Sequence, residues 1–381
     1  MKDKRNSYLV QSIFAANAKT IFVVTGAGSA AVRWLLSVGG ASSTVLEALV
    51  PYGAAAMEEY LGWMPEKFVS HTTAEAMAAA AYVRGARYKQ SQELLVAVAC
   101  TATITTNRVK KGAHGAHVCV RNAHSSTNYH LEIEKGLRDR GGEEDLVSQL
   151  ILQTLAKDLH LVDRIELDLS ANERLSSSTM PSSQVTADLF DRTISRLLCY
   201  TPDAMVADAP FSGLILPGSF NPMHDGHLLL AKAAERKTGR RAAFELSIDN
   251  VDKQSLPKEV VLDRLRQPRM TGQRVLLTHA PLFNQKAQLY PGSTFVIGFD
   301  TASRVVEPKY YGGSVQAMML ALAEIRAADC NFLVAGRKVS DRFMTLSDLW
   351  LPSGYEKLFH GLSEDEFRLD LSSTEIRAER G

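Results

Sequence analysis

The segment richest in side chains that could do chemistry is residues 218–227, GSFNPMHDGH. His224 and His227 are three residues apart, which places both imidazoles on one face of the first turn of a helix. The unpaired N–H groups and the positive dipole end of such a turn favour phosphate oxygens. Gly226 removes a Cβ where a phosphate or a nucleobase would approach closely, and Gly218 permits a tight turn. For this motif alone, the alternative is a pair of histidines that only cap the helix.

A second candidate for anion binding lies near the end of the chain, in LSSTEIR over residues 371–377. Hydroxyl donors at the start of a helix, followed one turn later by an arginine, can clamp an anion between them. Ser373, Thr374 and Arg377 would supply these groups. Taken alone, the segment is equally well explained as a helix N-cap with a solvated arginine. The presence of both segments in one chain strengthens the phosphate-binding interpretation of each.

Together, GSFNPxHxGH and SSTxIR resemble the nucleotidyltransferase superfamily, and specifically the nicotinamide or nicotinic acid mononucleotide adenylyltransferases. The resemblance covers about residues 213–378. It implies a cytidylyltransferase-like domain with a Rossmann-like, doubly wound parallel sheet of the HxGH type. It also implies an enzyme that transfers AMP from ATP to nicotinamide or nicotinic acid mononucleotide, releases pyrophosphate and uses Mg²⁺ carried by the nucleotide. Phosphopantetheine adenylyltransferases fit less well because they usually lack the first histidine.

The same resemblance implies roles for individual residues. His224 and His227 would bind the nucleotide phosphates, with His227 at the α-phosphate, and Arg377 would complete the catalytic set. The nucleotide contacts implied are Gly218, Ser219, Phe220, Gly226, Gly298, Asp300, Ser373 and Thr374. Asp300 would accept hydrogen bonds from the ribose. Lys253 lies where these enzymes often carry a lysine toward the acceptor phosphate, although an ordinary surface lysine explains it equally well.

The first half of the chain carries a different resemblance. TGAGSAAVRWLLSVGGASSTVLEALVPY and the later VSHTTAEAMA are similar to the CinA C-terminal family of nicotinamide-nucleotide amidases, over about residues 18–158. In that family a serine in an ESCTGG-like loop is the nucleophile, whereas Gly26 stands at that place here, and the later glycine-rich loop is replaced by ACTATITTNRVKKGAHG. A glycine cannot attack an amide. We therefore predict no deamidation of nicotinamide mononucleotide, unless Ser29 or Thr25 serves instead.

Two other clusters in the first half have both a binding and a non-binding interpretation. Lys110 and Lys111 with the TGAGS loop could bind a phosphate at a βα turn, or could be a solvated basic edge beside a glycine turn. His114, His117 and Cys119 suggest a metal site, but the sequence indicates no fourth ligand. We therefore predict no metal bound by protein side chains.

Alternating strand and helix patterns predict two α/β domains. The expected boundaries are 1–169 for the CinA-like domain, 170–209 for a Ser/Thr-rich linker with a connecting helix at about 187–198, and 210–381 for the nucleotidyltransferase domain. The expected strands are 20–24, 94–99, 118–120, 213–216, 244–248, 295–298 and 331–336. The expected helices are 72–88, 144–155, 227–238 and 318–325.

Composition limits the partners. The 381 residues have a formal net charge of +1, which gives no field for holding nucleic acid non-specifically. No apolar run approaches the roughly 20 residues of a membrane span, so we expect a soluble cytoplasmic protein. The four cysteines show no CxxC spacing and are expected to be buried thiols. The partners expected are ATP and a phosphorylated small-molecule acceptor, and the sequence leaves a homo-oligomer open.

The sequence leaves two alternative functions open. One is an enzyme that transfers CMP or AMP to another phosphorylated small molecule with the same phosphate machinery. The other is a non-catalytic nucleotide sensor or assembly protein, suggested by the missing amidase serine. The intact histidines and Arg377 count against the sensor.

Overall fold

The structure is a computed structural model of the chain. By its internal contacts the chain divides into two compact units, unit 1 with Met1–Asp188 and Asp203–Ala207, and unit 2 with Leu189–Pro202 and Asp208–Gly381. Both are built from helices and sheets, which confirms the α/β class. The residues described are 2–107, 111–249, 254–267, 270, 272–339 and 342–368.

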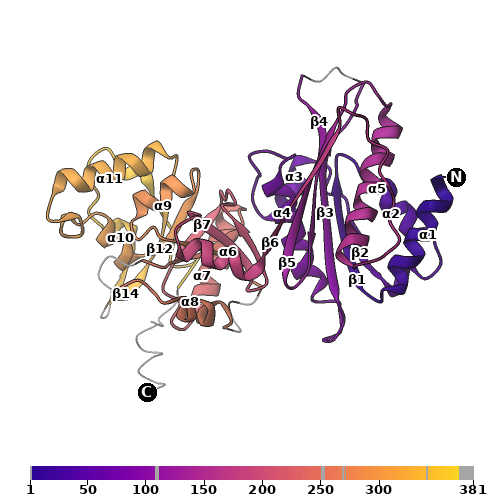
Figure 1. Ribbon diagram of the computed structural model, residues 1–381. Coiled ribbons are helices and arrows are strands. Elements are labelled where there is room, and N and C mark those ends of the chain that lie inside the picture. Colours follow the sequence, from indigo (N-terminus) through magenta and orange to yellow (C-terminus); the bar gives the residue numbers. More distant parts are fainter. Residues whose placement is uncertain are drawn as a thin grey trace. The chain divides into compact units, whose positions relative to one another are not determined.

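The sheet of unit 1 has the strand order β2-β1-β3-β4-β5-β6. The strands are β1 (Lys19–Thr25), β2 (Val45–Leu49), β3 (Leu95–Thr103), β4 (His114–Arg121), β5 (Ser125–Ile133) and β6 (Arg174–Pro181). Strands β2, β1 and β3 are parallel, and the pairs from β3 to β6 are antiparallel. The helices are α1 (Lys2–Ala15), α2 (Ser29–Leu36), α3 (Ala54–Leu61), α4 (His71–Gly85) and α5 (Arg140–Asp158). Helices α1, α2 and α5 lie on one side of this sheet, and α3 and α4 lie on the other (Figure 1).

Strand β3 is buried on both faces, which is why LVAVACTAT reads as a continuous apolar run. Val96, Val98 and Cys100 alternate into the core that α1, α2 and α5 close. The alanine-rich helix α4 packs against β3 and β1 on the opposite face. Its N-cap is Ser70, whose Oγ accepts from the Thr73 N–H at 3.1 Å, so the helix begins one residue before the expected residue 72.

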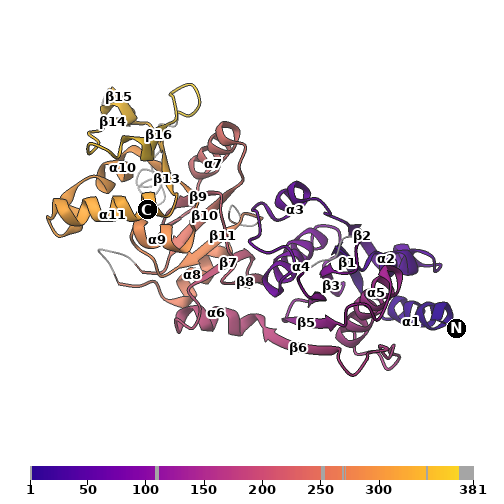
Figure 2. The same ribbon diagram turned by 90° about the horizontal axis from the view of Figure 1, so that it is seen from above.

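The segment expected as a linker is largely a strand. Residues 174–181 form β6 and pair with β5 along its whole length, so the linker interpretation is wrong for this stretch. Figure 2 shows β6 at the margin of its sheet. All of its side chains are exposed, so it has no alternation of buried and exposed positions from which a strand could be predicted. The next helix, α6 (Ser182–Phe190), begins before the expected 187–198, and the end of that expected helix lies in strand β7 (Arg196–Thr201).

The sheet of unit 2 contains the run β16-β13-β12-β9-β10-β11-β7. Its strands are β7, β9 (Leu214–Pro217), β10 (Ala242–Ser247), β11 (Val275–Thr278), β12 (Thr294–Gly298), β13 (Asn331–Ala335) and β16 (Phe359–Gly361). All pairs in this run are parallel except β11 with β7. Counted in chain order, β11-β10-β9-β12-β13 is the order 3-2-1-4-5, so the direction of strand addition reverses at β9. In open α/β sheets, ligands bind beside such a reversal, at the carboxyl ends of the strands.

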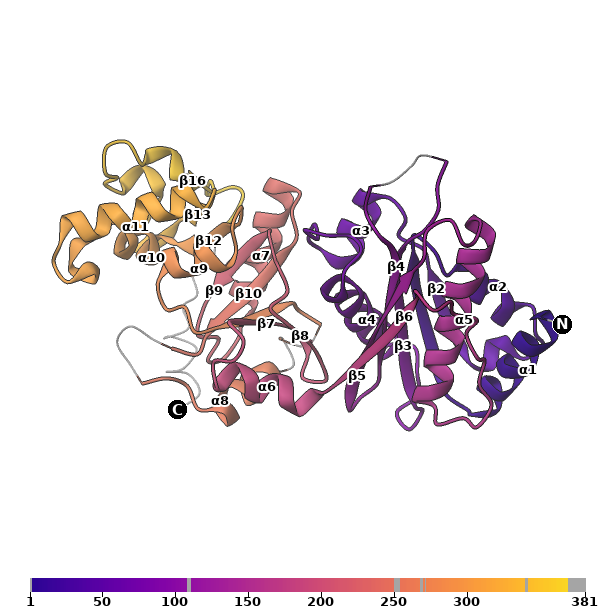
Figure 3. The same cartoon turned by 45° about the horizontal axis from the view of Figure 1, so that its top comes forward.

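The helices of unit 2 connect these strands. They are α7 (Asp225–Thr238), α8 (Lys258–Leu265), α9 (Phe283–Leu289), α10 (Phe299–Val305) and α11 (Val315–Ala327). Helix α7 packs against β9 and β10, and α10 packs against β12 and β13 (Figure 3). The four predicted strands and two predicted helices of this half are confirmed. The shorter α8, α9, α10 and β11 were not predicted, because each spans too few residues to show a period.

The chain also contains short strands and several 3₁₀ turns. They are β8 (Ala204–Ala207), β14 (Arg337–Val339), β15 (Arg342–Met344), and the 3₁₀ turns Ala41–Ser43, Pro308–Tyr311, Leu346–Asp348 and Glu356–Leu358. All four cysteines are buried free thiols, as expected: Cys100, Cys119, Cys199 and Cys330. None of the helices that the structure describes has the length and apolar character needed to cross a membrane.

Candidate functional site

The loop that follows β9 is held in one conformation by the region around α8. Phe220 has a left-handed backbone (φ 45°) and a fully buried side chain. The guanidinium of Arg264 donates to the Ser219 carbonyl at 2.7 Å. The side-chain amide of Gln267 donates to the Phe220 carbonyl at 3.1 Å and accepts from the Met223 N–H at 2.8 Å. The loop is therefore shaped by its neighbours before any ligand is present.

The two histidines lie together at the start of α7, as their spacing predicted. His224 is the N-cap residue, and its backbone N–H donates to Nδ1 of His227 at 3.2 Å. The ring centroids are 3.8 Å apart, and the Phe220 ring meets His227 edge-on at 5.1 Å. Burial and the nearby His224 lower the pKa of His227 to about 4. At neutral pH His227 is therefore uncharged, and because Nδ1 accepts, its proton is on Nε2.

A pocket of about 340 Å³ lies at the carboxyl ends of β9 and β10. Its walls include the loop residues Gly218 and Ser219, which confirms that part of the motif borders a cavity. The other lining residues are Pro217, Asn221, Glu245, Leu246, Ser247, Asp249, Gln254, Leu256, Arg264, Pro281, Phe283, Lys286 and Thr301. His224 and His227 are not among them, so neither histidine lines this cavity.

A buried ion pair lies in the pocket wall. Nζ of Lys286 is 2.8 Å from both carboxylate oxygens of Glu245 and 2.6 Å from the Ala280 carbonyl. An ammonium group has three N–H donors, so these contacts use all of them. Lys286 therefore balances the charge of Glu245 and is not free to hold a phosphate. Among the described residues, the Arg264 guanidinium donates one side-chain hydrogen bond, to the Ser219 carbonyl, out of its five N–H donors.

Asp249 is the other acidic residue of the pocket. Its carboxylate accepts from Ser255 Oγ at 2.7 Å and Arg192 Nη2 at 2.9 Å, and it lies 3.2 Å from His279 Nδ1. Burial alone would raise the pKa of Asp249, but these three hydrogen bonds together lower it. The side chain is therefore ionised at neutral pH and already bound by protein groups.

Other predicted site residues lie apart from the cavity or outside the described part of the chain. Asp300 forms an ion pair with Arg337 and does not line the pocket, whereas its neighbour Thr301 does. Gly298 is the N-cap of α10, and a Cβ there would meet no described atom within 4 Å. Gly226 is buried in the first turn of α7. Lys110, Lys253, Ser373, Thr374 and Arg377 lie outside the described residues.

In unit 1, Gly26 occupies a place where no side chain fits. Its φ is +80°, and a Cβ built on it would lie 1.9 Å from the Ala102 carbonyl oxygen. A serine could stand there only if the backbone moved. The position predicted for the missing nucleophile is thus closed by backbone as well as by residue type.

The hydrogen-bond donors at the start of α2, one of the possible phosphate sites, are bound by an internal carboxylate. Glu144 accepts from the Gly28 N–H at 3.1 Å, the Ala30 N–H at 3.0 Å and the Ser29 hydroxyl at 2.9 Å. These are the donors that an anion would use. The structure therefore supports the glycine-turn interpretation of TGAGS, and it directs Ser29 toward a carboxylate.

The cluster of His114, His117 and Cys119 does not converge. Side chains alternate between the two faces of a strand, so His114 points away from the other two. His114 contacts the buried carboxylate of Glu143 at 3.1 Å. In the described parts of the chain, no group of three histidine, cysteine or acidic side chains is placed to hold a metal ion.

Three residues that line the pocket were not predicted from the sequence: Glu245, Lys286 and Arg264. Glu245 did leave a signal, because a single carboxylate stands within the apolar strand AAFELS. Lys286 and Arg264 lie on short helices that carry no motif, so only the fold brings them to the pocket.

No protein-family model matches this chain, and no curated protein matches it. Several solved structures of CinA-type proteins are similar to part of it. The competence/damage-inducible protein CihA from Agrobacterium tumefaciens has 19% identity and a TM-score of 0.34, over 42% of this chain and 94% of that one. A CinA superfamily protein from Klebsiella pneumoniae has 9% identity and a TM-score of 0.35, over 42% and 98%. One from Escherichia coli has 15% identity and a TM-score of 0.30, over 42% and 88%. Similarity at this level assigns no activity to this chain.

Proposed function

We propose that unit 2 is a nucleotidyltransferase that moves AMP from ATP to a mononucleotide, nicotinamide or nicotinic acid mononucleotide, with release of pyrophosphate. The observation that carries the proposal is the hydrogen bond from the His224 N–H to Nδ1 of His227, which leaves Nε2–H to donate to a ligand. His227 lies in the first turn of α7. The loop before that turn is held by hydrogen bonds from Arg264 and Gln267 and lines a pocket at the carboxyl edge of a parallel sheet.

The reaction needs no nucleophilic side chain. An oxygen of the acceptor phosphate attacks the α-phosphorus of ATP, a new P–O bond forms, and the bond to pyrophosphate breaks. His227 Nε2–H donates to an α-phosphate oxygen as charge builds there, and the proposal assigns the β- and γ-phosphates to Ser373, Thr374 and Arg377. Such donors stabilise the transition state without transferring a proton.

Electrostatics near the pocket are compatible with two anionic substrates. Lys286 neutralises Glu245, and Asp249 is bound by Ser255, Arg192 and His279. Arg264, which has no carboxylate partner among the described residues, contributes a positive charge at the wall, in the role that the sequence had suggested for Lys253. These carboxylates are already occupied, so Mg²⁺ would arrive on the nucleotide, where it neutralises polyphosphate charge.

The test is pyrophosphate release by the full chain, screened over ATP and CTP against phosphorylated acceptors. The proposal expects the highest turnover with ATP and nicotinamide or nicotinic acid mononucleotide. Turnover only with CTP or another acceptor would favour the alternative transferase. A chain that binds ATP and turns over no acceptor would favour the nucleotide sensor.

We also infer that unit 1 is not an amidase. Gly26 admits no side chain, and the Ser29 hydroxyl donates to the Glu144 carboxylate, which also accepts from two backbone N–H groups. Because the predicted nucleophile position is closed, ammonia release from nicotinamide mononucleotide should be absent. Release that disappears in Ser29→Ala would show instead that a displaced serine is the nucleophile.

A further inference from the structure

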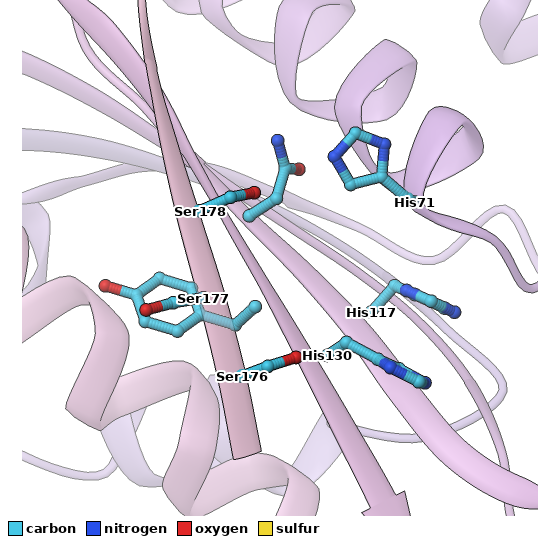
Figure 4. Close-up of a pocket in the computed structure, with 8 residues that line it drawn as sticks. His71, His117, His130, Ser176, Ser177 and Ser178 are labelled. Carbon is cyan, nitrogen blue, oxygen red and sulfur yellow. The ribbon is translucent and has the colours of Figure 1, made fainter.

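Unit 1 contains a pocket of about 380 Å³ that the proposed function does not use. It lies over β4, β5 and β6, beside the start of α4 (Figure 4). Figure 4 shows His117 and His130 side by side, the serines of β6 next to them, and His71 coming from the helix. Its lining residues are His71, His117, Asn128, Tyr129, His130, Ser176, Ser177 and Ser178.

The strand register arranges the floor of the pocket in two rows. His117 is opposite His130, which is opposite Ser176, and in the next row Asn128 is opposite Ser178. Because these positions on each strand are two residues apart, both rows lie on one face of the sheet. The imidazoles of His117 and His130 are stacked, with centroids 4.4 Å apart and an interplanar angle of 5°. The stack stops at Ser176, whose small side chain leaves the outer face of His130 open to another ring.

The next row has a polar group without a partner. Asn128 is only 7% exposed, and its Oδ1 accepts no hydrogen bond from any residue that the structure describes. A buried acceptor left unpaired is destabilising, so a ligand that donates to it would bind more tightly. The rows are about 7 Å apart along a strand, which a two-ring base can span.

The geometry argues against a metal ion. The lone pairs of an imidazole lie in the plane of its ring, so two stacked rings direct them into parallel planes. His117 and His130 therefore cannot both approach one ion at the usual distance of about 2.0–2.1 Å. Among the described residues, no group of three ligands suited to a metal is found here.

The charges argue against an anion. None of the lining residues is a lysine or an arginine. Burial, together with the nearby His130 and His71, lowers the pKa of His117 to about 4, so that ring is neutral at pH 7. Glu75, the carboxylate 4.0 Å from His71 Nδ1, is paired with the buried Arg121 at 3.3 Å. A phosphate would find no fixed positive charge among the lining side chains.

We propose that this pocket binds a neutral nitrogen heteroaromatic ring of purine size, stacked on His130 over Ser176, with an N–H group donating to Oδ1 of Asn128. The ring extends the imidazole stack by one member. The hydroxyls of Ser176 and Ser178 supply further donors or acceptors at its edge. This site is independent of the transferase proposed for unit 2.

The test uses adenosine as the probe and the ring signals of His117 and His130 in NMR spectra of the full chain. These signals report binding in this pocket alone, whatever binds to unit 2. Adenosine should shift them saturably through its ring current. N6,N6-dimethyladenosine, which lacks the N–H donors of the base, should bind about 10-fold more weakly, as the loss of about 1.4 kcal/mol implies.

Two variants locate the ring. Ser176→Phe fills the proposed stacking position and should abolish the shift. Thr179→Phe, on the same exposed strand but on the opposite face and outside the pocket lining, should keep it. The proposal is overturned if adenosine gives no saturable shift, if its dimethyl analogue binds equally well, or if Ser176→Phe binds as the wild type does. It is also overturned if inorganic phosphate or Zn²⁺ alone shifts these signals.

Discussion

The side chain on which the proposed transferase chiefly depends is His227. Its position on one face of a helix start followed from a spacing of three residues. Its protonation state could not be predicted, because it depends on the backbone N–H of His224 in its N-cap conformation and on burial against Phe220. Spacing predicts which side chains meet, whereas the fold decides what proton each carries.

The lowered pKa of His227 makes stability depend on pH. The unfolded chain binds a proton at His227 near pH 6.5, whereas the folded chain binds it only near pH 4. Above pH 6.5, the neutral His227 side chain therefore contributes fully to the free energy of unfolding. This contribution decreases as the pH falls toward 4, and about 1–2 kcal/mol of it is lost at pH 5. Urea unfolding at pH 7 and pH 5 should show a smaller loss in His227→Gln. An equal loss in both proteins would contradict the shift.

Gly26 offers a test of the closed nucleophile position. Gly26→Ser places a Cβ against the Ala102 carbonyl in a left-handed backbone, so it should lower the free energy of unfolding by more than about 2 kcal/mol. It should also restore no ammonia release. Gly39→Ser is the matched control, because a Cβ there meets no described atom within 4 Å. A stable Gly26→Ser protein with amidase activity would overturn this account of unit 1.

At the scale of elements, buried strands were predictable and exposed ones were not. Strands such as β3 and β12 are continuous apolar runs, which a sequence shows directly. Strand β6 is held by backbone pairing to β5 and has no buried side chain, so its composition indicated a linker. The sequence did not predict the histidine pocket for the same reason, because Ser176 and Ser178 are placed beside the histidines only by the pairing of β6 with β5.

The pairing of β6 can be measured by hydrogen exchange. In an antiparallel edge strand, about half of the amides donate to the neighbouring strand and half face solvent. A peptide covering residues 174–181 should therefore show slow exchange for about half of its amides, whereas the irregular stretch 162–168 should exchange quickly. Fast exchange throughout 174–181 would restore the linker interpretation.

Glu144 caps the start of α2, and this contact can be tested by mutation. Glu144→Ala removes the acceptor of three hydrogen bonds, from Gly28, Ser29 and Ala30, and should lower the free energy of unfolding by about 1–2 kcal/mol. Added sulfate should then stabilise the variant more than the wild type, because the donors are left open to an anion. Asp145→Ala, one residue further on, is the control. Equal responses to sulfate would contradict an internal anion at this helix start.

At the scale of the whole molecule, the sequence predicted two α/β units but placed their boundary differently. Residues 203–207 belong to unit 1, where the Asp203 and Met205 carbonyls accept from the buried Arg121 at 3.3 and 2.8 Å. Such a return of the chain leaves no local signal, because it depends on contacts 82 and 84 residues apart in sequence.

The central claim is that unit 2 transfers a nucleotide with His227 as a transition-state donor, and the most direct measurement is pyrophosphate release by the wild type and by His227→Ala. The removal of one such donor typically costs about 10²–10³ in kcat. We predict that loss with little change in the KM for ATP, whereas Arg377→Ala should also raise KM. A folded His227→Ala protein that releases pyrophosphate at the wild-type rate would contradict the mechanism.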